Sequence, residues 1–170
     1  MSNVVRMTGV LDPREGWVAD RCSIAKALAV VSTRSSFLIL REAFYGTERF
    51  DEFVDRAGIS EAVAATRLHE LVDEGLLERE AYRDPGQRTR RLYRLTPKGA
   101  DLFPALVALQ QWGDRWANDG GRVELLHRDC SAPVSVEVRC AAGHEVQPGD
   151  LDLAIKRRRP PLRPSGRTRA

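Results

Sequence analysis

Apolar residues recur at helical spacing in four stretches of the first 75 residues, namely residues 22–31, 35–46, 49–58 and 60–75. The second stretch has the most apolar side chains, so we expect it to be the most buried helix. Only Ile59 separates Gly58, a typical helix stop, from Ser60, a good helix N-cap. The third and fourth predicted helices are therefore joined as in a helix-turn-helix.

The pattern changes after Gly75. Residues 76–83 and 89–96 are predicted strands, and the Asp84-Pro85-Gly86 turn between them makes a β-hairpin. A single helix is predicted over residues 97–118, with a kink at Pro104 because proline disrupts a helix interior. Helix-turn-helix, hairpin and long helix in this order are typical of a winged helix-turn-helix.

The fold class is therefore mainly α with a small β-hairpin wing (α+β), plus a small C-terminal β-appendage. Within the appendage Val134, Val136 and Val138 alternate with polar residues, which predicts a strand. The predicted organisation has four parts: an N-terminal arm (1–20), a winged-helix DNA-binding and dimerisation domain (21–119), a β-rich appendage (120–155) and a basic disordered tail (156–170).

Positive charge is concentrated in two places. The chain has a net charge of +3, but residues 156–170 carry seven basic and no acidic residues, which leaves −4 for residues 1–155. Five further arginines surround the predicted hairpin turn: Arg83, Arg88, Arg90, Arg91 and Arg94. Local clusters of cations are the footprint of a polyanion-binding surface. Solvated, disordered residues are the alternative interpretation of the tail.

Other features limit the class of protein. The sequence has no apolar run long enough for a transmembrane helix and no signal-peptide pattern at its start, and its three cysteines do not suit a disulfide framework. We therefore expect a cytoplasmic protein without a membrane partner. No Gly-rich phosphate loop, nucleophile elbow or acid/base pair is found, so an enzyme is not expected.

The ordered motifs resemble those of the HxlR-type transcriptional regulators, which are related to the MarR group. The resemblance rests on Cys22 before IAKALAVV, on FLILREAFYG (37–46), RFDEFVDRAGIS (49–60) and RLHELVDEGLLERE (67–80), and on YRLTPKGADLFPALVALQQWG (93–113). It spans about residues 20–117. It implies a homodimeric DNA-binding repressor or activator, which in some members of the family responds to oxidants or aldehydes.

Double-stranded DNA is thus the expected partner. The predicted contacts on the recognition helix are Ser60, Glu61, Ala62, Thr66 and Arg67, and those on the wing are Arg88, Arg90 and Arg91. Arg67 is the strongest candidate for a bidentate guanine contact. Because this helix has few cations, we expect the wing and tail to supply much of the affinity.

The helix over residues 97–118 is too apolar for one side of a small domain. Trp112 and Trp116 near its end indicate a second surface to bury, and the helix over residues 22–31 could pack beside it. Together they would form a two-fold dimer interface, which suits a two-fold operator. The alternative is that these residues only complete a monomeric core.

The three cysteines suggest two further sites. Cys22 lies at a predicted helix N-terminus near cations, which favours a reactive thiolate, and the family resemblance implies a redox switch there; a structural cysteine is the alternative. His127, Cys130, Cys140 and His144 have paired short spacings that suit a structural zinc ion, although no cofactor is required for the fold.

The leading hypothesis is a sequence-specific, dimeric DNA-binding regulator, a repressor that responds to a small molecule or a redox signal. The sequence does not identify the effector. The alternative is a winged-helix protein-interaction module without specific DNA binding, which is favoured by the acidic residues Glu61 and Glu70 on the recognition helix.

Overall fold

The computed structural model describes residues 4–11, 22–31, 33–82, 90–117 and 120–155, which form two compact units. One unit is Ala19–Val136, the winged-helix unit. The other combines Met1–Val18 with Glu137–Ala170, the terminal unit. No single described helix is long and apolar enough to cross a membrane. Only the two helices Ser23–Val31 and Arg34–Phe44 taken together reach that length and apolar composition among the described residues, and they are bent by 79° relative to each other.

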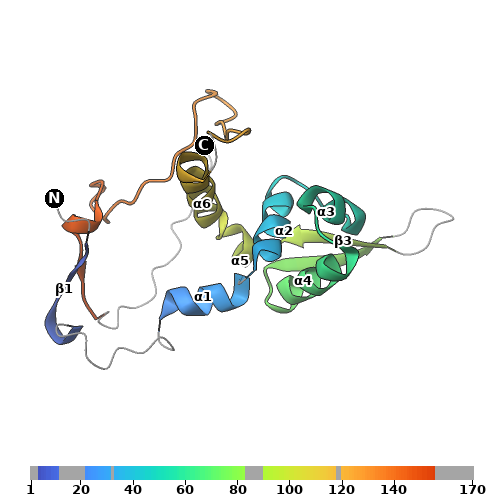
Figure 1. The fold of residues 1–170 in the computed structure, drawn as a ribbon, viewed down its shortest axis with the longest axis horizontal. Helices are drawn as coiled ribbons and strands as arrows, with labels where there is room; N and C mark the ends of the chain where they lie inside the picture. Colours follow the sequence, from blue (N-terminus) through green and yellow to red (C-terminus); the bar gives the residue numbers. More distant parts are fainter. Residues whose placement is uncertain (1–3, 12–21, 32, 83–89, 118–119, 156–170) are drawn as a thin grey trace, which may run out of the picture. The chain divides into compact units, whose positions relative to one another are not determined.

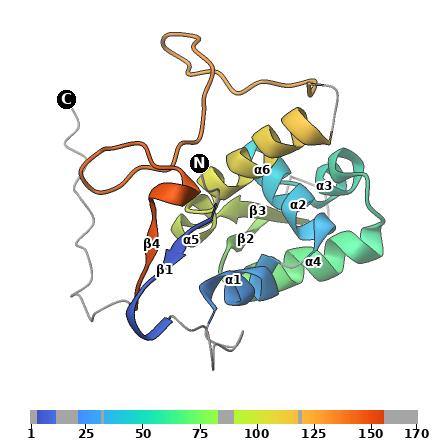
Figure 2. The same cartoon turned by 60° about the vertical axis from the view of Figure 1, so that its left-hand side comes forward.

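The winged-helix unit has six helices and one hairpin among its described residues (Figures 1 and 2). They are α1 (Ser23–Val31), α2 (Arg34–Phe44), α3 (Phe50–Ala57), α4 (Glu61–Asp73), β2 (Leu77–Tyr82), β3 (Arg90–Leu95), α5 (Pro97–Ala100) and α6 (Phe103–Trp116). This order confirms the predicted winged helix-turn-helix.

The helix-turn-helix forms because its ends are specified locally. Gly58 closes α3 in the left-handed conformation, with φ 60°, a conformation that glycine adopts without steric cost. Two residues later the Ser60 side chain accepts a hydrogen bond from the Val63 N–H and caps α4. Thr33 caps α2 in the same way, by accepting from the Ser36 N–H at 3.1 Å.

The core is centred on α2, as the apolar density of its sequence predicts. Ile39 and Leu40 of α2 are fully buried and belong to one cluster with Phe53 of α3 and Leu68 of α4. Tyr93 of β3 closes the cluster from the hairpin side, with its ring edge-on to Phe53 at a centroid distance of 6.2 Å. The hairpin is thereby fixed to both helices of the helix-turn-helix.

The hairpin is antiparallel, with Leu77 opposite Leu95 at its base and Tyr82 opposite Arg90 at the last described pair. A short segment before α3 lies along the other edge of β3. There the Tyr93 N–H donates to the Glu48 carbonyl at 2.8 Å, and Arg49 forms an antiparallel bridge with Leu92. This bridge places the start of α3 beside the outer half of β3.

The predicted helix over residues 97–118 is wrong as a single element. It is divided into α5 and α6, and Pro104 lies in the first turn of α6 rather than in a helix interior. That position tolerates proline because its missing N–H has no intrahelical partner there. The sequence thus located the break in the helix near Pro104 but predicted a kink where the structure has two separate helices.

The predicted strand at Val134, Val136 and Val138 is also wrong. No strand is found there; residues 120–146 contain only isolated bridges, Leu126 with Pro133 and Arg139 with Glu145. Within the winged-helix unit, the Gln111 side chain takes the place of a partner strand. Its Nε2 donates to the Val134 carbonyl at 2.7 Å and its Oε1 accepts from the Val136 N–H at 3.1 Å.

The terminal unit joins the two ends of the described chain. Strand β1 (Arg6–Met7) pairs in parallel with β4 (Asp152–Leu153), so residues 4–11 are not the separate arm that the sequence suggested. The Arg6 guanidinium donates to both Asp152 carboxylate oxygens, at 2.6 and 2.8 Å, and these hydrogen bonds lower the pKa of Asp152. The predicted basic tail, residues 156–170, lies outside the described residues.

Candidate nucleic-acid interface

Helix α4 presents the predicted recognition surface. Its inner face buries Ala64, Leu68 and Leu71, in agreement with the helical spacing of apolar residues over residues 60–75. The exposed residues include the expected candidates Ser60, Glu61, Ala62 and Thr66, together with Val63, Ala65, His69, Glu70 and Asp73. Arg67 is half-buried at the side of this face.

The two hydroxyl groups on α4 are already engaged by the helix. Ser60 Oγ caps the first turn through the Val63 N–H, and Thr66 Oγ1 donates to the Ala62 carbonyl at 2.9 Å. With its proton directed at Ala62, the Thr66 hydroxyl can only accept a hydrogen bond from a further partner. Thr66 in this conformation therefore suits a donor on a base edge and not a phosphate oxygen.

The basic side chains of α4 lie beside acidic neighbours one turn away. Arg67 Nη1 lies 2.5 Å from Glu70 Oε2, and His69 Nε2 lies 3.4 Å from Asp73 Oδ2. With Glu61, Glu70 and Asp73 on the same helix as Arg67 and His69, α4 has no net positive charge. The expectation that the recognition helix contributes specificity more than electrostatic affinity is consistent with this geometry.

The hairpin distributes its charges unevenly. Near its base Arg94 lies 2.8 Å from Glu48 Oε1 and 2.5 Å from Glu80 Oε2, and the hydrogen bond to Glu48, followed by its charge and that of Glu80, raises the pKa of Arg94. Three further hairpin arginines are described, Arg79, Arg90 and Arg91, and no carboxylate of the described residues lies within ion-pair distance of them. Arg88 lies outside the described part of the chain.

Two of these arginines face α4. In the hairpin register Arg79 is opposite Tyr93 and Arg91 is opposite Ala81. Because side chains alternate along a strand, Arg79 and Arg91 share the face that carries Tyr93. A groove of about 340 Å³ lies between this face and the helices; we call it the α4–hairpin groove, and it is lined by Phe50, Ala65, His69, Val72, Arg79, Arg91 and Tyr93.

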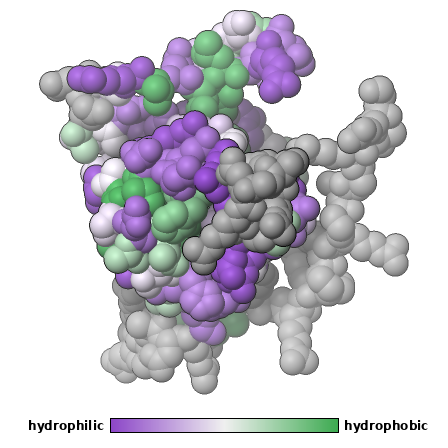
Figure 3. All heavy atoms as spheres, turned by 90° about the vertical axis from the view of Figure 1, so that its right-hand side faces the viewer, coloured by the Kyte–Doolittle hydropathy of each residue, from purple (hydrophilic) through white to green (hydrophobic). Residues whose placement is uncertain are grey.

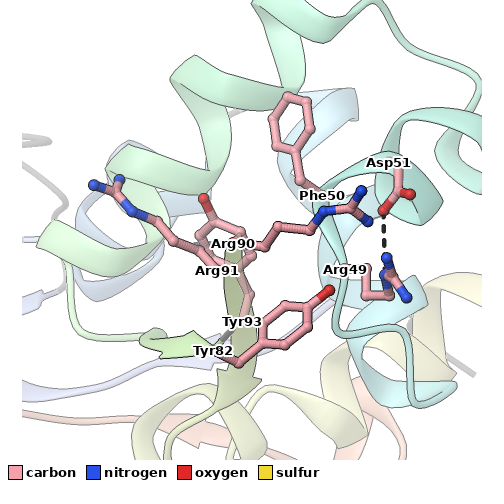
Figure 4. A pocket seen from close by; sticks show the side chains of 7 residues that line it. All are labelled: Arg49, Phe50, Asp51, Tyr82, Arg90, Arg91 and Tyr93. Carbon is pink, nitrogen blue, oxygen red and sulfur yellow. Dashed lines mark ion pairs between the residues drawn. The ribbon is translucent and has the colours of Figure 1, made fainter. Parts of the chain in front are cut away.

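A second hollow of about 560 Å³ adjoins it between the start of α3 and the outer half of the hairpin. We call it the α3–hairpin pocket; Figure 4 shows its lining residues, Arg49, Phe50, Asp51, Tyr82, Arg90, Arg91 and Tyr93. Arg49 lies over the Tyr82 ring, with its guanidinium carbon 5.8 Å from the ring centroid, and 3.6 Å from Asp51 Oδ1. The pocket thus combines three guanidinium groups with one carboxylate.

The surface around the hairpin is suited to a charged partner. Figure 3 shows the face from which the hairpin projects, where hydrophilic side chains surround a smaller apolar patch in the part drawn in colour. A polyanion that follows the α4–hairpin groove would meet Arg79 and Arg91 without displacing a carboxylate of the described residues. The geometry therefore places free cations beside the recognition helix and not on it.

The predicted cysteine sites are only partly assembled. Cys22 is half-buried immediately before α1, and its carbonyl accepts from the Lys26 N–H; all three thiols are free. His127 Nδ1 lies 3.2 Å from Cys130 Sγ in the winged-helix unit, and Cys140 Sγ lies 3.6 Å from His144 Nδ1 in the terminal unit. Within the described ranges no three His, Cys, Asp or Glu side chains are grouped to hold a metal, so zinc stays a prediction.

Sequence reasoning missed three residues of this surface: Arg49, Arg79 and Tyr82. The alternation of the predicted strands was a signal for Arg79, since a hairpin with Arg91 facing inward places Arg79 on the same side. No local signal pointed to Arg49, because its position depends on the bridge to Leu92, 43 residues later.

Known proteins share both the sequence pattern and this architecture. The uncharacterized HTH-type transcriptional regulator Rv3095 of Mycobacterium tuberculosis is 38% identical over 127 residues, which cover 73% of this chain and 79% of the relative. The crystal structure of PA1607, a candidate transcription factor, superposes with a TM-score of 0.71 at 35% identity and covers 81% of this chain and 97% of that one. PA1374 of Pseudomonas aeruginosa, also a candidate transcription factor, matches with a TM-score of 0.54 at 38% identity, over 74% of this chain and 86% of that one.

The family assignment agrees with the site. Residues 30–120 match the HxlR-like helix-turn-helix family. The matched segment contains α2 to α6 and therefore both the helix-turn-helix and the hairpin. The matched relatives carry the name of HTH-type transcriptional regulators. From the motifs, the fold and these matches, the chain belongs to the HxlR-like family of helix-turn-helix transcriptional regulators.

Proposed function

We propose that this protein binds a specific operator in double-stranded DNA, with α4 in the major groove and the hairpin along the flanking backbone. The observation that carries the proposal is the α4–hairpin groove, where Arg79 and Arg91 face the recognition helix without a carboxylate partner among the described residues. Phosphate contacts from such arginines supply affinity, while base contacts from α4 supply specificity.

The proposal includes a homodimer. Apolar side chains on α1 and α6 are strongly exposed, with relative exposures of 71% for Ile24, 61% for Trp112 and 66% for Trp116. Exposed tryptophans on one helix are typical of a surface that a partner covers. A two-fold dimer would place two α4 helices about 34–36 Å apart, one turn of the duplex.

We further propose that the dimer acts in the cytoplasm as a repressor, because a protein that covers an operator excludes others from it. Its signal would be a small molecule or an oxidant, the latter acting at Cys22. The free, half-buried Cys22 thiol beside the exposed face of α1 supports the redox alternative.

Fluorescence anisotropy tests the central proposal. The full chain is titrated into labelled DNA tiles from its own upstream region and into their scrambled sequences, at two salt concentrations. We expect one tile to bind tightly and with strong salt dependence, because phosphate contacts release counterions. Equal, weak binding to every tile would contradict sequence-specific recognition.

A protein-interaction module is the second candidate function. It is favoured by the acidic neighbours on α4, where Glu70 and Asp73 lie beside the two basic side chains of the helix, Arg67 and His69. In the same titration, such a module would bind the upstream tiles no more tightly than their scrambled sequences. No single tile would then show a higher affinity than the others.

A further inference from the structure

The α3–hairpin pocket contains a polar group whose hydrogen bonding is incomplete. The Tyr82 hydroxyl is buried, and it has no hydrogen-bond partner among the described residues. A buried hydroxyl without a partner costs free energy, which is recovered when a ligand supplies the missing acceptor. The Tyr82 hydroxyl is therefore a candidate contact for something that enters the pocket.

Two guanidinium groups accompany this hydroxyl. Arg90 is directly opposite Tyr82 in the hairpin register, and Arg49 lies over the Tyr82 ring. Figure 4 shows Arg49 and Arg90 on the side of the pocket to which the Tyr82 hydroxyl points, whereas Arg91 extends the other way. Asp51, 3.6 Å from Arg49, offsets one of these two charges and leaves the other uncompensated by the described residues.

The base of the same hairpin face provides a contrast. Arg94 lies on the face of β3 that carries Arg90, four residues further along the strand, and it is enclosed by Glu48 and Glu80. Positive charge on this face is therefore neutralised at the base of the hairpin and left free beside Tyr82. The charge of Arg90 does not stabilise the fold through an ion pair within the described residues. An uncompensated charge at this position is suited to binding an external anion.

The chemistry of the pocket selects a phosphate group. Arginine side chains offer donors only, and an aromatic hydroxyl can donate, so the ligand must present several acceptor oxygens and negative charge. Planar guanidinium groups match phosphate oxygens in bidentate geometry. The pocket volume of about 560 Å³ leaves room for a phosphate together with its attached sugar.

The position of the pocket selects DNA as the source of that phosphate. Three residues, Phe50, Arg91 and Tyr93, line both the α3–hairpin pocket and the α4–hairpin groove, so the two hollows adjoin. A single DNA strand that occupies the groove can continue into the pocket and place successive phosphates in both. A free nucleotide would gain nothing from this continuity.

We infer that the α3–hairpin pocket is a seat for one backbone phosphate of DNA, held by the Tyr82 hydroxyl and the guanidinium groups of Arg49 and Arg90. The inference rests on the proposed function and adds a contact outside the major groove. It assigns Tyr82 a role that is independent of base sequence, since a phosphate carries no sequence information.

The decisive variant is Tyr82→Phe, which removes one oxygen and keeps the ring under Arg49. We expect its affinity for the operator and for scrambled DNA to fall by about tenfold each, the usual loss for one hydrogen bond to a charged group. Its melting temperature without DNA should not fall, because the hydroxyl makes no bond within the described protein. Tyr45→Phe is the matched control, since Tyr45 is exposed at the end of α2 and is not among the residues that line the pocket.

Salt dependence separates the arginine contacts from the hydroxyl contact. Arg90→Gln should weaken binding and reduce the slope of log K against log salt by about 0.9, one phosphate contact. Tyr82→Phe should leave the slope unchanged, because no cation is lost. Arg94→Gln, the matched arginine on the same face, should also leave the slope unchanged, since Glu48 and Glu80 already compensate Arg94.

Three outcomes would overturn the phosphate seat even if the wild-type protein binds its operator. Unchanged DNA affinity in Tyr82→Phe, with wild-type protein binding its operator, would reject the seat and leave the proposed function intact. A lower melting temperature with proportionate loss of binding would assign the hydroxyl to folding. Calorimetric binding of a mononucleotide that Tyr82→Phe abolishes, without change in DNA affinity, would assign the pocket to a free phosphorylated ligand. Wild-type protein that binds no DNA at all would instead reject the proposed function, and the DNA occupant with it.

Discussion

At the scale of single residues, Arg67 has the clearest prediction for specificity. It is the only arginine on α4, and Glu70 holds its guanidinium at 2.5 Å along the helix surface. If Arg67 reads a guanine, Arg67→Ala should cost about 1–3 kcal/mol at one base position. Anisotropy with a set of operators substituted one base pair at a time measures this loss. Equal losses on operator and scrambled DNA would show that Arg67 does not read a base.

Cys22 has a separate prediction. After treatment with an oxidant, wild-type protein should give a band of twice the monomer mass on a non-reducing gel, because no second cysteine lies among the described residues of α1 to α6. Cys22→Ser should lack this band. Cys130→Ser is the control, since Cys130 is the exposed thiol of the same unit and should not be needed for the cross-link. A band that persists without Cys22 would contradict a switch at this residue.

Residues whose role is local were predictable, and residues whose role depends on distant partners were not. Ser60 was recognised as a cap because capping needs only the next three residues. The neutralisation of Arg94 could not be predicted, because Glu48 is 46 residues away and meets it only after the segment before α3 has paired with β3. The same long-range pairing brings Arg49 to Tyr82 and creates the α3–hairpin pocket.

At the scale of elements, two helical glycines have opposite predicted effects. A methyl group on Gly99 of α5 would lie 2.1 Å from the Leu76 carbonyl oxygen, whereas a methyl group on Gly113 of α6 would meet nothing within 4 Å. Gly99→Ala should therefore destabilise the fold by about 3 kcal/mol through overpacking. Gly113→Ala should stabilise it by about 0.5–1 kcal/mol through helix propensity. Thermal or urea unfolding measures both, and a destabilising Gly113→Ala together with a neutral Gly99→Ala would contradict this packing.

The elements that the sequence predicted well are those with caps and core contacts of their own. Helices α2, α3 and α4 each end at a specified residue and bury one face. The valine alternation at residues 134–138 failed because a strand also needs a neighbouring strand, and here Gln111 of α6 provides the hydrogen bonds instead. A periodic pattern indicates which secondary structure a segment favours, but it does not show which segment will pair with it.

At the scale of the whole molecule, the change in sequence pattern after α6 predicts a winged-helix part and a separate C-terminal part. The composition of the terminal unit, which includes the start of the chain, was not predicted. The pairing of Arg6–Met7 with Asp152–Leu153 joins segments about 145 residues apart, and two-residue strands leave no periodicity to detect. The boundary between the units also lies at residue 136 rather than at residue 120.

The last prediction concerns assembly. Trp112 and Trp116 of α6 are exposed in the single chain, at 61% and 66%, and the proposed dimer would bury them. Trp112→Arg should therefore convert the dimer into a monomer, which light scattering after size exclusion would detect as a halved molar mass. It should also weaken operator binding far more than binding to a half-site, since only the dimer engages both halves at once. The matched control is Val4→Arg, which adds the same charge at an exposed apolar residue of the terminal unit and should leave both measurements unchanged. A wild-type protein that is monomeric at all concentrations would contradict the interface, and a Trp112→Arg protein that remains dimeric would locate it elsewhere on the molecule.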